Sequence, residues 1–197
     1  MKLFKKQPVA LLLALLIVVG ALFVGVNRSV LTEVRALEGQ FINGVYDRLT
    51  GSDWRPGIHG QLTQRTTAAM RMLSVGEHSH ADSSELTDVG QELTAARGAL
   101  LDLLAEGAGP RALFQADQAL EIAAARYYAV LHPLVVAVEG EDLAALEAAY
   151  STMQSAARVI RDSGYNEAVV AFQRVLGAFP MNMLRPIVLI PMPELFA

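Results

Sequence analysis

The sequence predicts an all-α protein in which one N-terminal transmembrane helix precedes an elongated, antiparallel four-helix-type bundle. Three observations support this fold class: an unbroken apolar run near the N-terminus, apolar residues at helical spacing through the rest of the chain, and almost no strand-like alternation. Ala and Leu dominate the composition, which also favours helices. We divide the chain into a basic tip and anchor (1–27), a helical bundle (28–180) and an apolar, proline-containing tail (181–197).

The predicted anchor is Val9–Val26, a run of 18 residues without a polar side chain. As a helix it would extend ~27 Å, close to the ~30 Å of a bilayer's hydrocarbon core. A buried core helix and a signal peptide cleaved near Val19–Ala21 are the alternatives, but the apolar run continues past that site, which favours an uncleaved anchor. The positions expected to span the membrane are Val9, Leu12, Leu15, Val18, Leu22 and Val26.

The charges are distributed unevenly along the chain. All three lysines (Lys2, Lys5 and Lys6) precede the apolar run, and all 20 acidic residues follow it, which gives the body a formal net charge of −7. An acidic body does not attract phosphate backbones, so we expect no nucleic-acid binding. The positive-inside rule places the N-terminus in the cytoplasm. We therefore expect a single-pass protein of the cell membrane with its bundle on the extracytoplasmic side.

Apolar residues recur at steps of three and four over the first half of the body. The first stripe predicts that one helix continues from the membrane into water until a break at Gly51–Gly57, where Pro56 disfavours helix. Asp82 to Glu85 has the spacing of a capping box for a later helix. The stripes are Val30, Val34, Leu37 and Phe41; Ile58, Leu62, Thr66, Ala69 and Leu73; and Leu86, Val89, Leu93, Ala96, Leu100 and Leu103.

The second half of the body continues the pattern. Gly107 suits the end of one helix and Pro110 the first turn of the next, which Pro133 should bend or end early. After a break at Glu139–Asp142, we predict one helix of 38 residues from Asp142 to Phe179, with a change of phase at Gly164. Because each stripe is apolar on one side, the helices must pack against one another.

Few residues suggest chemistry. Glu77, His78, His80 and Asp82 form the best candidate metal cluster, but His residues two apart do not share a helix face, so we interpret the stretch as a solvated turn. Asp117 lies in an apolar stripe; we expect it at a solvated edge, with a buried polar group that fixes helix register as the alternative. The chain has no cysteine, which excludes thiolate chemistry. We predict no catalytic, cofactor or metal site.

The tail alternates prolines with apolar residues, including Ile187–Ile190 and Pro193–Phe196. Its prolines forbid a continuous helix. Either it folds back over an apolar groove of the bundle, or it contacts the membrane or a partner, since exposed apolar patches commonly mark binding sites.

The C-terminal third resembles the LemA family. The residues that carry the resemblance are Tyr165, Asn166, Glu167, Phe172, Phe179 and Pro180, followed by the Pro-Glu-Leu-Phe end at Pro193–Phe196. Weaker similarity covers Ser29–Phe41, Trp54–Ile58 and His132–Pro133, whereas Gly44, Gly51 and Gly57 interrupt a helix that is charged and regular in typical members. The resemblance implies a membrane-anchored helical bundle without established activity, in which these motif residues are structural.

Together these patterns predict a non-enzymatic interaction or scaffold protein that contacts the lipid bilayer and recruits a protein partner. The alternative is a ligand-sensing or lipid-contacting bundle, with a groove near Gly51–Ile58 and the tail. The sequence leaves the oligomeric state open.

Overall fold

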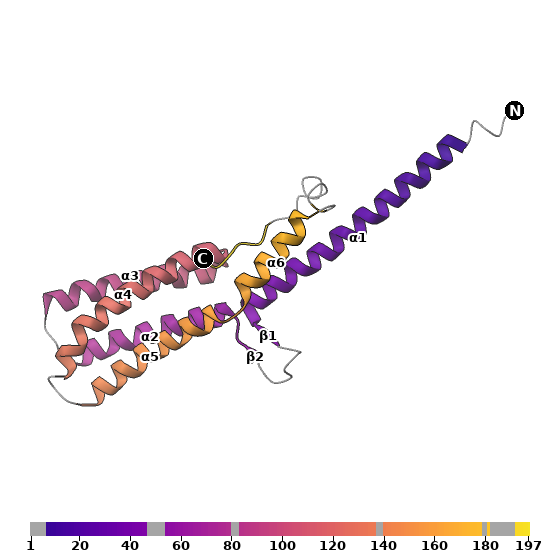
Figure 1. The fold of residues 1–197 in the computed structure, drawn as a ribbon. Helices are drawn as coiled ribbons and strands as arrows, with labels where there is room; N and C mark the ends of the chain where they lie inside the picture. Colours follow the sequence, from indigo (N-terminus) through magenta and orange to yellow (C-terminus); the bar gives the residue numbers. More distant parts are fainter. Residues whose placement is uncertain (1–6, 47–53, 80–82, 137–139, 179–180, 182–191) are drawn as a thin grey trace. The chain divides into compact units, whose positions relative to one another are not determined.

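The computed structural model describes residues 7–46, 54–79, 83–136, 140–178, 181 and 192–197. Within these ranges it contains six helices and one pair of very short strands (Figure 1). The predicted all-helical bundle is confirmed. The elements are α1 (Gln7–Asn43), β1 (Val45–Tyr46), β2 (Trp54–Arg55), α2 (Ile58–His78), α3 (Ser84–Glu106), α4 (Pro110–Val136), α5 (Glu141–Arg161) and α6 (Tyr165–Gly177).

The chain forms two compact units. One comprises Met1–Glu38 and Ala171–Pro193, and the other comprises Gly39–Val170 and Glu194–Ala197; we call the second the bundle unit. These units cut across the three ranges expected from the sequence, because α1 and α6 contribute to both. The last four residues of the expected tail belong to the bundle unit.

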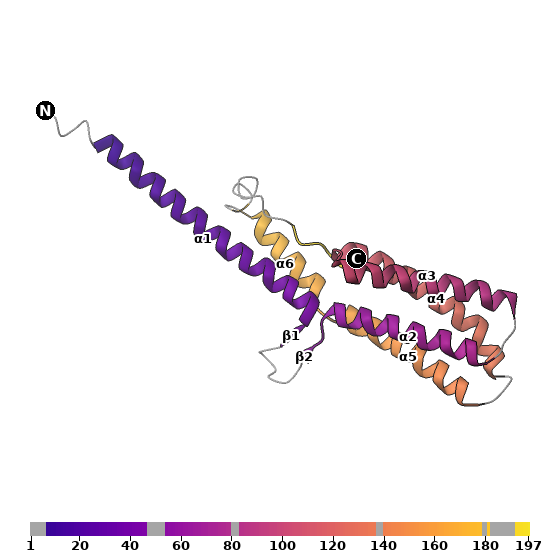
Figure 2. The ribbon, with the colours of Figure 1, turned by 180° about the vertical axis from the view of Figure 1, so that it is seen from behind.

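Helices α2 to α5 form the core of the bundle unit. Helix α2 packs mainly against α5, and α3 packs mainly against α4; these two pairs are visible from both sides (Figures 1 and 2). Short connections make successive helices antiparallel. The apolar stripes meet inside, where the following side chains are at most 2% exposed: Leu62, Met72, Leu93, Leu100, Leu113, Leu120, Leu131, Leu146 and Met153.

The helix ends agree in part with the predicted signals. Gly107 ends α3 in the left-handed conformation (φ 67°), and its N–H bonds to the carbonyls of Leu103 and Leu104, as expected for a C-terminal glycine. Helix α4 begins at Pro110, as predicted. The expected cap Asp82 lies outside the described residues, and Ser83 caps α3 instead by accepting from the N–H of Leu86.

Two other breaks differ in detail from the predictions. Pro133 does not end α4, which continues to Val136. Helix α1 ends at Asn43, earlier than the break predicted at 51–57. Strand β1 follows it and pairs antiparallel with β2, which lies in that break, so that Val45 is opposite Arg55 and Tyr46 is opposite Trp54. Strands this short are below the length at which alternation can be recognised in a sequence.

The predicted helix from Asp142 to Phe179 is wrong, because the chain breaks it into α5 and α6. Helix α5 ends at Arg161, Gly164 adopts φ +71°, and α6 begins at Tyr165. A positive φ is costly for residues with a Cβ but not for glycine. The change of apolar phase at Gly164 therefore marks a turn in the backbone.

Helix α1 contains all of Val9–Val26. The side chains of Val9, Leu12, Leu15, Val18 and Leu22 lie outside the described residues, and Val26 is partly exposed. Further along α1, Val30, Val34 and Leu37 are buried, as predicted for the first stripe of the body. Phe172 and Leu176, in the part of α6 that belongs to the same compact unit, are buried too.

One helix in the described part of the chain is long and apolar enough, by length and composition, to cross a membrane, and it is α4. Its buried face packs on α3 and α5. Its outer face carries exposed polar and charged side chains: Arg111, Gln115, Gln118, Glu121 and Arg126. This distribution is that of a helix that packs on neighbours on one side and meets water on the other.

The turn at Gly164 yields a prediction about stability. Gly164→Ala should lower the free energy of unfolding by about 1–2 kcal/mol, because alanine is strained at positive φ. Gly98→Ala is the matched control: Gly98 lies inside α3, and an added methyl group there meets nothing within 4 Å. It should raise the free energy of unfolding by up to about 1 kcal/mol. Equal effects of the two changes in chemical denaturation would contradict the assigned role of Gly164.

Candidate docking site for the C-terminal segment

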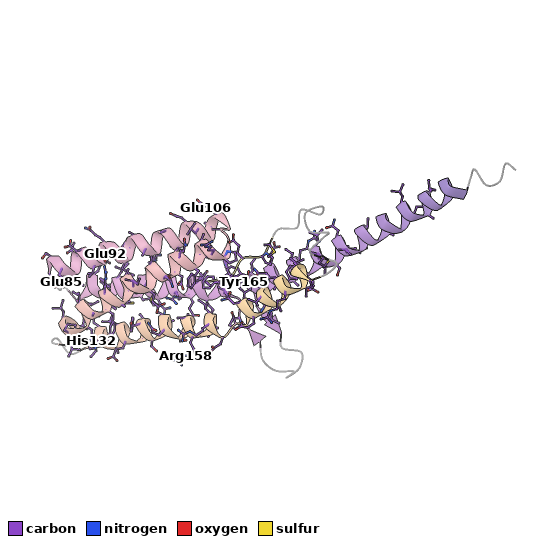
Figure 3. The ribbon with its side chains drawn as sticks, turned by 45° about the horizontal axis from the view of Figure 1, so that its top comes forward. Glu85, Glu92, Glu106, His132, Arg158 and Tyr165 are labelled. Atoms are coloured by element: carbon purple, nitrogen blue, oxygen red, sulfur yellow. The ribbon has the colours of Figure 1, made fainter. Side chains whose placement is uncertain are left out.

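The C-terminal residues Glu194–Ala197 pack on one end of the bundle unit. Phe196 is 5% exposed although it is the penultimate residue of the sequence. The residues that surround it come from the end of α1, the start of α4 and the start of α6. Tyr165, which opens α6, lies at the end of the bundle opposite to Glu85 and His132 (Figure 3). We call this region the tail-docking site.

Asn166 binds the backbone of Phe196 in both directions. Its Nδ2 donates to the carbonyl oxygen of Phe196 at 2.9 Å, and its Oδ1 accepts from the N–H of Phe196 at 2.9 Å. A carboxamide carries one donor and one acceptor group side by side, so it satisfies both polar groups of one peptide residue, as an adjacent strand would. This contact recognises an extended backbone and does not depend on the side chain at position 196.

The ring of Phe196 enters an aromatic cluster. Its centroid lies 5.2 Å from that of Phe114, edge to face, and 6.0 Å from that of Phe41. Phe41 in turn lies 5.2 Å from Tyr165, also edge to face. These separations and angles fall in the favourable range for aromatic pairs. The ring of Phe196 is therefore held in an aromatic cluster next to the position where Asn166 binds its backbone.

Glu194 adds two further contacts. Its carbonyl oxygen accepts a hydrogen bond from the Tyr165 hydroxyl at 3.0 Å. Its carboxylate lies against Gly109, where an added Cβ would come within 2.8 Å of Oε2. Gly109 immediately precedes α4, and a carboxylate is favoured at the positive end of a helix. Glu194 and Phe196, two positions apart, thus both contact this end of the bundle unit.

The sequence predicted part of this site. Tyr165 and Asn166 were expected as structural motif residues, and the fold-back of the tail was one of two expectations; the described tail residues follow it. Glu167 is exposed, Phe172 is buried in the other compact unit, and Phe179 and Pro180 lie outside the described residues. Phe114 and Gly109 were missed as members of a site, because nothing local links them to residues 194–196.

The expectation that Asp117 lies at a solvated edge is wrong. Asp117 is 5% exposed, and its Oδ1 lies 2.9 Å from Nε of Arg65, which is 2% exposed. The N–H of Nε is not aligned for a hydrogen bond, so the contact is an ion pair. Arg65 Nη2 also donates to Glu121 at 3.1 Å. Asp117 therefore connects α4 to α2 inside the core, which is the register role left open by the sequence.

Burial and the charge of Arg65 shift the pKa of Asp117 in opposite directions. Burial raises the pKa of its carboxyl group to about 6, while the Arg65 guanidinium lowers it. The carboxylate is therefore mainly ionised at neutral pH. Buried ion pairs of this kind also shift pKa values in structural networks, and Asp117 does not line the groove between α2 and α3. We assign the pair a structural role.

A separate groove of ≈520 Å³ lies between α2 and α3. It does not coincide with the groove expected near Gly51–Ile58, where Gly57 and Ile58 are buried and 51–53 lie outside the described residues. Tyr127 of α4 forms the floor of the groove between α2 and α3. It lies beside Gly76, where an added Cβ would collide with the Tyr127 hydroxyl. Its rim is polar, with Glu77, Thr87, Gln91 and Thr94.

The candidate metal cluster is untested by the structure. His78 ends α2, and its Nδ1 lies 2.7 Å from the carbonyl oxygen of Ser74. His80 and Asp82 lie outside the described residues. In the part of the chain that the structure describes, no group of three potential His, Asp or Glu ligands comes together.

The buried ion pair predicts a specific pattern of stability changes. Asp117→Leu should lower the free energy of unfolding by about 3 kcal/mol or more, because it leaves the Arg65 charge poorly compensated in the core. Arg65→Met combined with Asp117→Leu should recover most of this loss. Glu92→Gln, which breaks the exposed Arg126–Glu92 pair, is the control and should cost less than ~1 kcal/mol. A double variant as unstable as Asp117→Leu in urea unfolding would contradict the assignment.

The tail contacts predict local protection of one amide. In Asn166→Ala, the N–H of Phe196 loses its acceptor, so its hydrogen exchange should accelerate at least tenfold while amides in the core of α4 keep their rates. Glu167→Ala, at the exposed neighbouring position, should leave the exchange of Phe196 unchanged. Exchange that is equally fast in the unmodified chain would show that the tail is not held by Asn166.

Comparison of the chain with protein-family models, with curated proteins and with solved structures finds no match. The similarity to LemA proteins therefore stays a prediction that depends on the residues quoted for it.

Proposed function

We propose that this protein is a single-pass membrane protein that presents a helical bundle as a non-enzymatic binding platform. The observation that carries the proposal is the surface of α1. Leu13, Leu16, Ile17 and Val24 are between 58% and 65% exposed, in the middle of a run without polar side chains. Burying a side chain of this kind is worth about 1.5–3 kcal/mol, so lipid is a far better solvent for this surface than water.

The contrast between α1 and α4 supports this assignment. Helix α4 is long and apolar enough in composition to span a bilayer, and α1 contains the 18-residue apolar run. The outer face of α4, however, carries charged side chains such as Glu121 and Arg126. Charges of that kind are expensive in the hydrocarbon region. The apolar part of α1 has none. We therefore assign α1 as the anchor and α4 as a bundle helix.

The side of the membrane follows from the basic tip. Lys2, Lys5 and Lys6 precede the anchor, which favours a cytoplasmic N-terminus. The bundle unit is then extracytoplasmic, where we propose that it binds a protein.

Binding is the activity that the described geometry favours. The tail-docking site offers an amide pair for a peptide backbone, an aromatic cluster and a helix start for a carboxylate. These are the elements by which proteins recognise short extended peptides. Arg65 and Asp117 compensate each other inside the core, which suits a scaffold whose shape must persist when the surface is occupied.

A second candidate function is ligand sensing. The groove between α2 and α3 favours it, because its apolar floor and polar rim would suit a small amphipathic molecule. Dodecyl phosphocholine below its micellar concentration is a suitable probe: a rise in the unfolding temperature that is lost on Gly90→Leu would support this function. No rise would remove its support.

The anchor can be tested by fractionation and labelling of cells. The unmodified chain should stay in membranes through alkaline carbonate washes and leave them only in detergent. Leu16→Arg combined with Ile17→Arg should appear in the soluble fraction, because each charge opposes insertion by about 2.5–3.5 kcal/mol. Thr32→Arg, at an exposed position beyond the apolar run, is the control.

Orientation can be read in the same cells, because the chain has no cysteine. A single cysteine at Ser79 or Thr152 should react with an impermeant thiol reagent in intact cells. Reaction only after lysis would reverse the proposed orientation. Release of the unmodified chain by carbonate, or a mature chain that lacks the apolar run, would contradict the anchor itself.

A further inference from the structure

We infer that α1, just beyond its apolar run, binds the phosphate of an anionic phospholipid between Arg28 and Arg35. The inference rests on the proposed anchor, because only a helix that spans the bilayer brings these residues to the lipid headgroups. It holds for either orientation of the chain. The observations that carry it are a groove on α1, the charges that line this groove and its distance from the apolar run.

A groove of ≈440 Å³ lies along one face of α1. Its lining residues follow one another at alternating steps of three and one, which places them on one side of the helix. On the opposite side, Val30, Val34 and Leu37 are buried. This stretch of α1 therefore packs with one face and leaves the other open. The groove is lined by Val24, Asn27, Arg28, Leu31, Thr32 and Arg35.

The polar part of the groove is basic. Arg28 and Arg35 are exposed, and neither forms an ion pair with the described residues. The described lining includes no acidic residue. The Thr32 hydroxyl donates to the carbonyl oxygen of Arg28 at 2.8 Å, so the donors left for a ligand are the two guanidinium groups and the Asn27 amide. Because a guanidinium binds phosphate through two parallel N–H groups, the groove suits a phosphate.

The position of the groove along α1 favours a lipid as the source of that phosphate. Arg28 follows Val26, the last residue of the apolar run, by two positions or about 3 Å of helix. The headgroup region on each side of the hydrocarbon core is about 5–8 Å thick, so Arg28 lies at headgroup depth. Arg35 lies about 10 Å farther, but helical side chains lean toward the N-terminus, which here is toward the bilayer.

The apolar lining distinguishes a lipid from a free phosphate ester. Val24 belongs to the apolar run and is 65% exposed, and Leu31 is 38% exposed. Both lie on the same face as the two arginines. A phospholipid covers such residues with its glycerol backbone and acyl chains while its phosphate meets the guanidinium groups. A free phosphate ester would leave them in water.

The net charge of the body gives the contact a physical role. The chain beyond the anchor has a formal net charge of −7, so an anionic bilayer repels it within about a Debye length, ~10 Å at 0.1 M salt. Arg28 and Arg35 are the first two basic residues after the apolar run. Pairing them with anionic lipid replaces repulsion by attraction at the point where the body meets the membrane.

Native mass spectrometry tests the lipid preference directly. The full chain is released from nanodiscs that contain phosphatidylglycerol and phosphatidylcholine in equal parts. It should retain phosphatidylglycerol about threefold more often than phosphatidylcholine, or more. Arg28→Gln combined with Arg35→Gln should bring this ratio to about one, because the amides are uncharged. Both positions are exposed, and circular dichroism verifies that the variant keeps its helices.

A matched control separates the groove from general attraction of positive charge. Each arginine is exchanged with its exposed neighbour: Arg28→Ser with Ser29→Arg, and Arg35→Ala with Ala36→Arg. This variant keeps the composition and the net charge, but it moves each guanidinium group about 100° around the helix, away from the groove. It should lose the preference for phosphatidylglycerol. A preference that persists would overturn the inference, because charge alone would then select the lipid.

The remaining outcomes are also decisive. Equal retention of the two lipids by the unmodified chain would overturn the inference. Glycerophosphoglycerol, the same headgroup without acyl chains, should form no adduct with the chain in uncharged detergent; an adduct as abundant as that of phosphatidylglycerol would overturn the lipid assignment. Release of the chain by carbonate would contradict the anchor and this inference together, whereas a chain that stays in membranes without a lipid preference contradicts this inference alone.

Discussion

The bundle unit depends on the burial of one-sided apolar stripes. Leu62, Leu93, Leu120 and Leu146 come from four different helices, and each has no exposed surface. A helix with such a stripe is marginal by itself in water, so it acquires its stability from the neighbours that cover the stripe. Helix lengths, turn positions and antiparallel order all follow from this constraint, because the connections must return each stripe to the same interior.

This constraint also explains which features the sequence could predict. Stripes at steps of three and four, Gly107 and Pro110 are local signals, and the structure confirms them. Asp117 has the same local pattern as its apolar neighbours, but its environment depends on Arg65, which lies 52 positions earlier in another helix. Periodicity identifies the face on which a residue lies. It does not identify the partner that makes a buried charge tolerable.

The same limit applies to the tail-docking site. Tyr165 and Asn166 could be singled out from sequence, but the site also needs Phe41 from the end of α1, and Gly109 and Phe114 from the start of α4. Gly164 was recognised as a change of phase, yet a change of phase is compatible with a continuous helix as well as with a turn. The positive φ of Gly164 resolves this choice, and it starts α6 with Tyr165 and Asn166 in its first turn.

We distinguish two kinds of apolar helix surface in this chain, one that packs in the bundle core and one that we propose faces lipid. The presence or absence of polar residues on the same helix distinguishes them. In α4, charged side chains on one face confine the apolar residues to the core, where the Arg65–Asp117 pair links two helices at one register. In the first part of α1, no polar residue confines the apolar surface to one side, so protein neighbours on one face could not cover it. A surrounding lipid phase covers all faces at once. The anchor that we propose thus follows from the same rule that assembles the bundle, applied to a helix without a polar face.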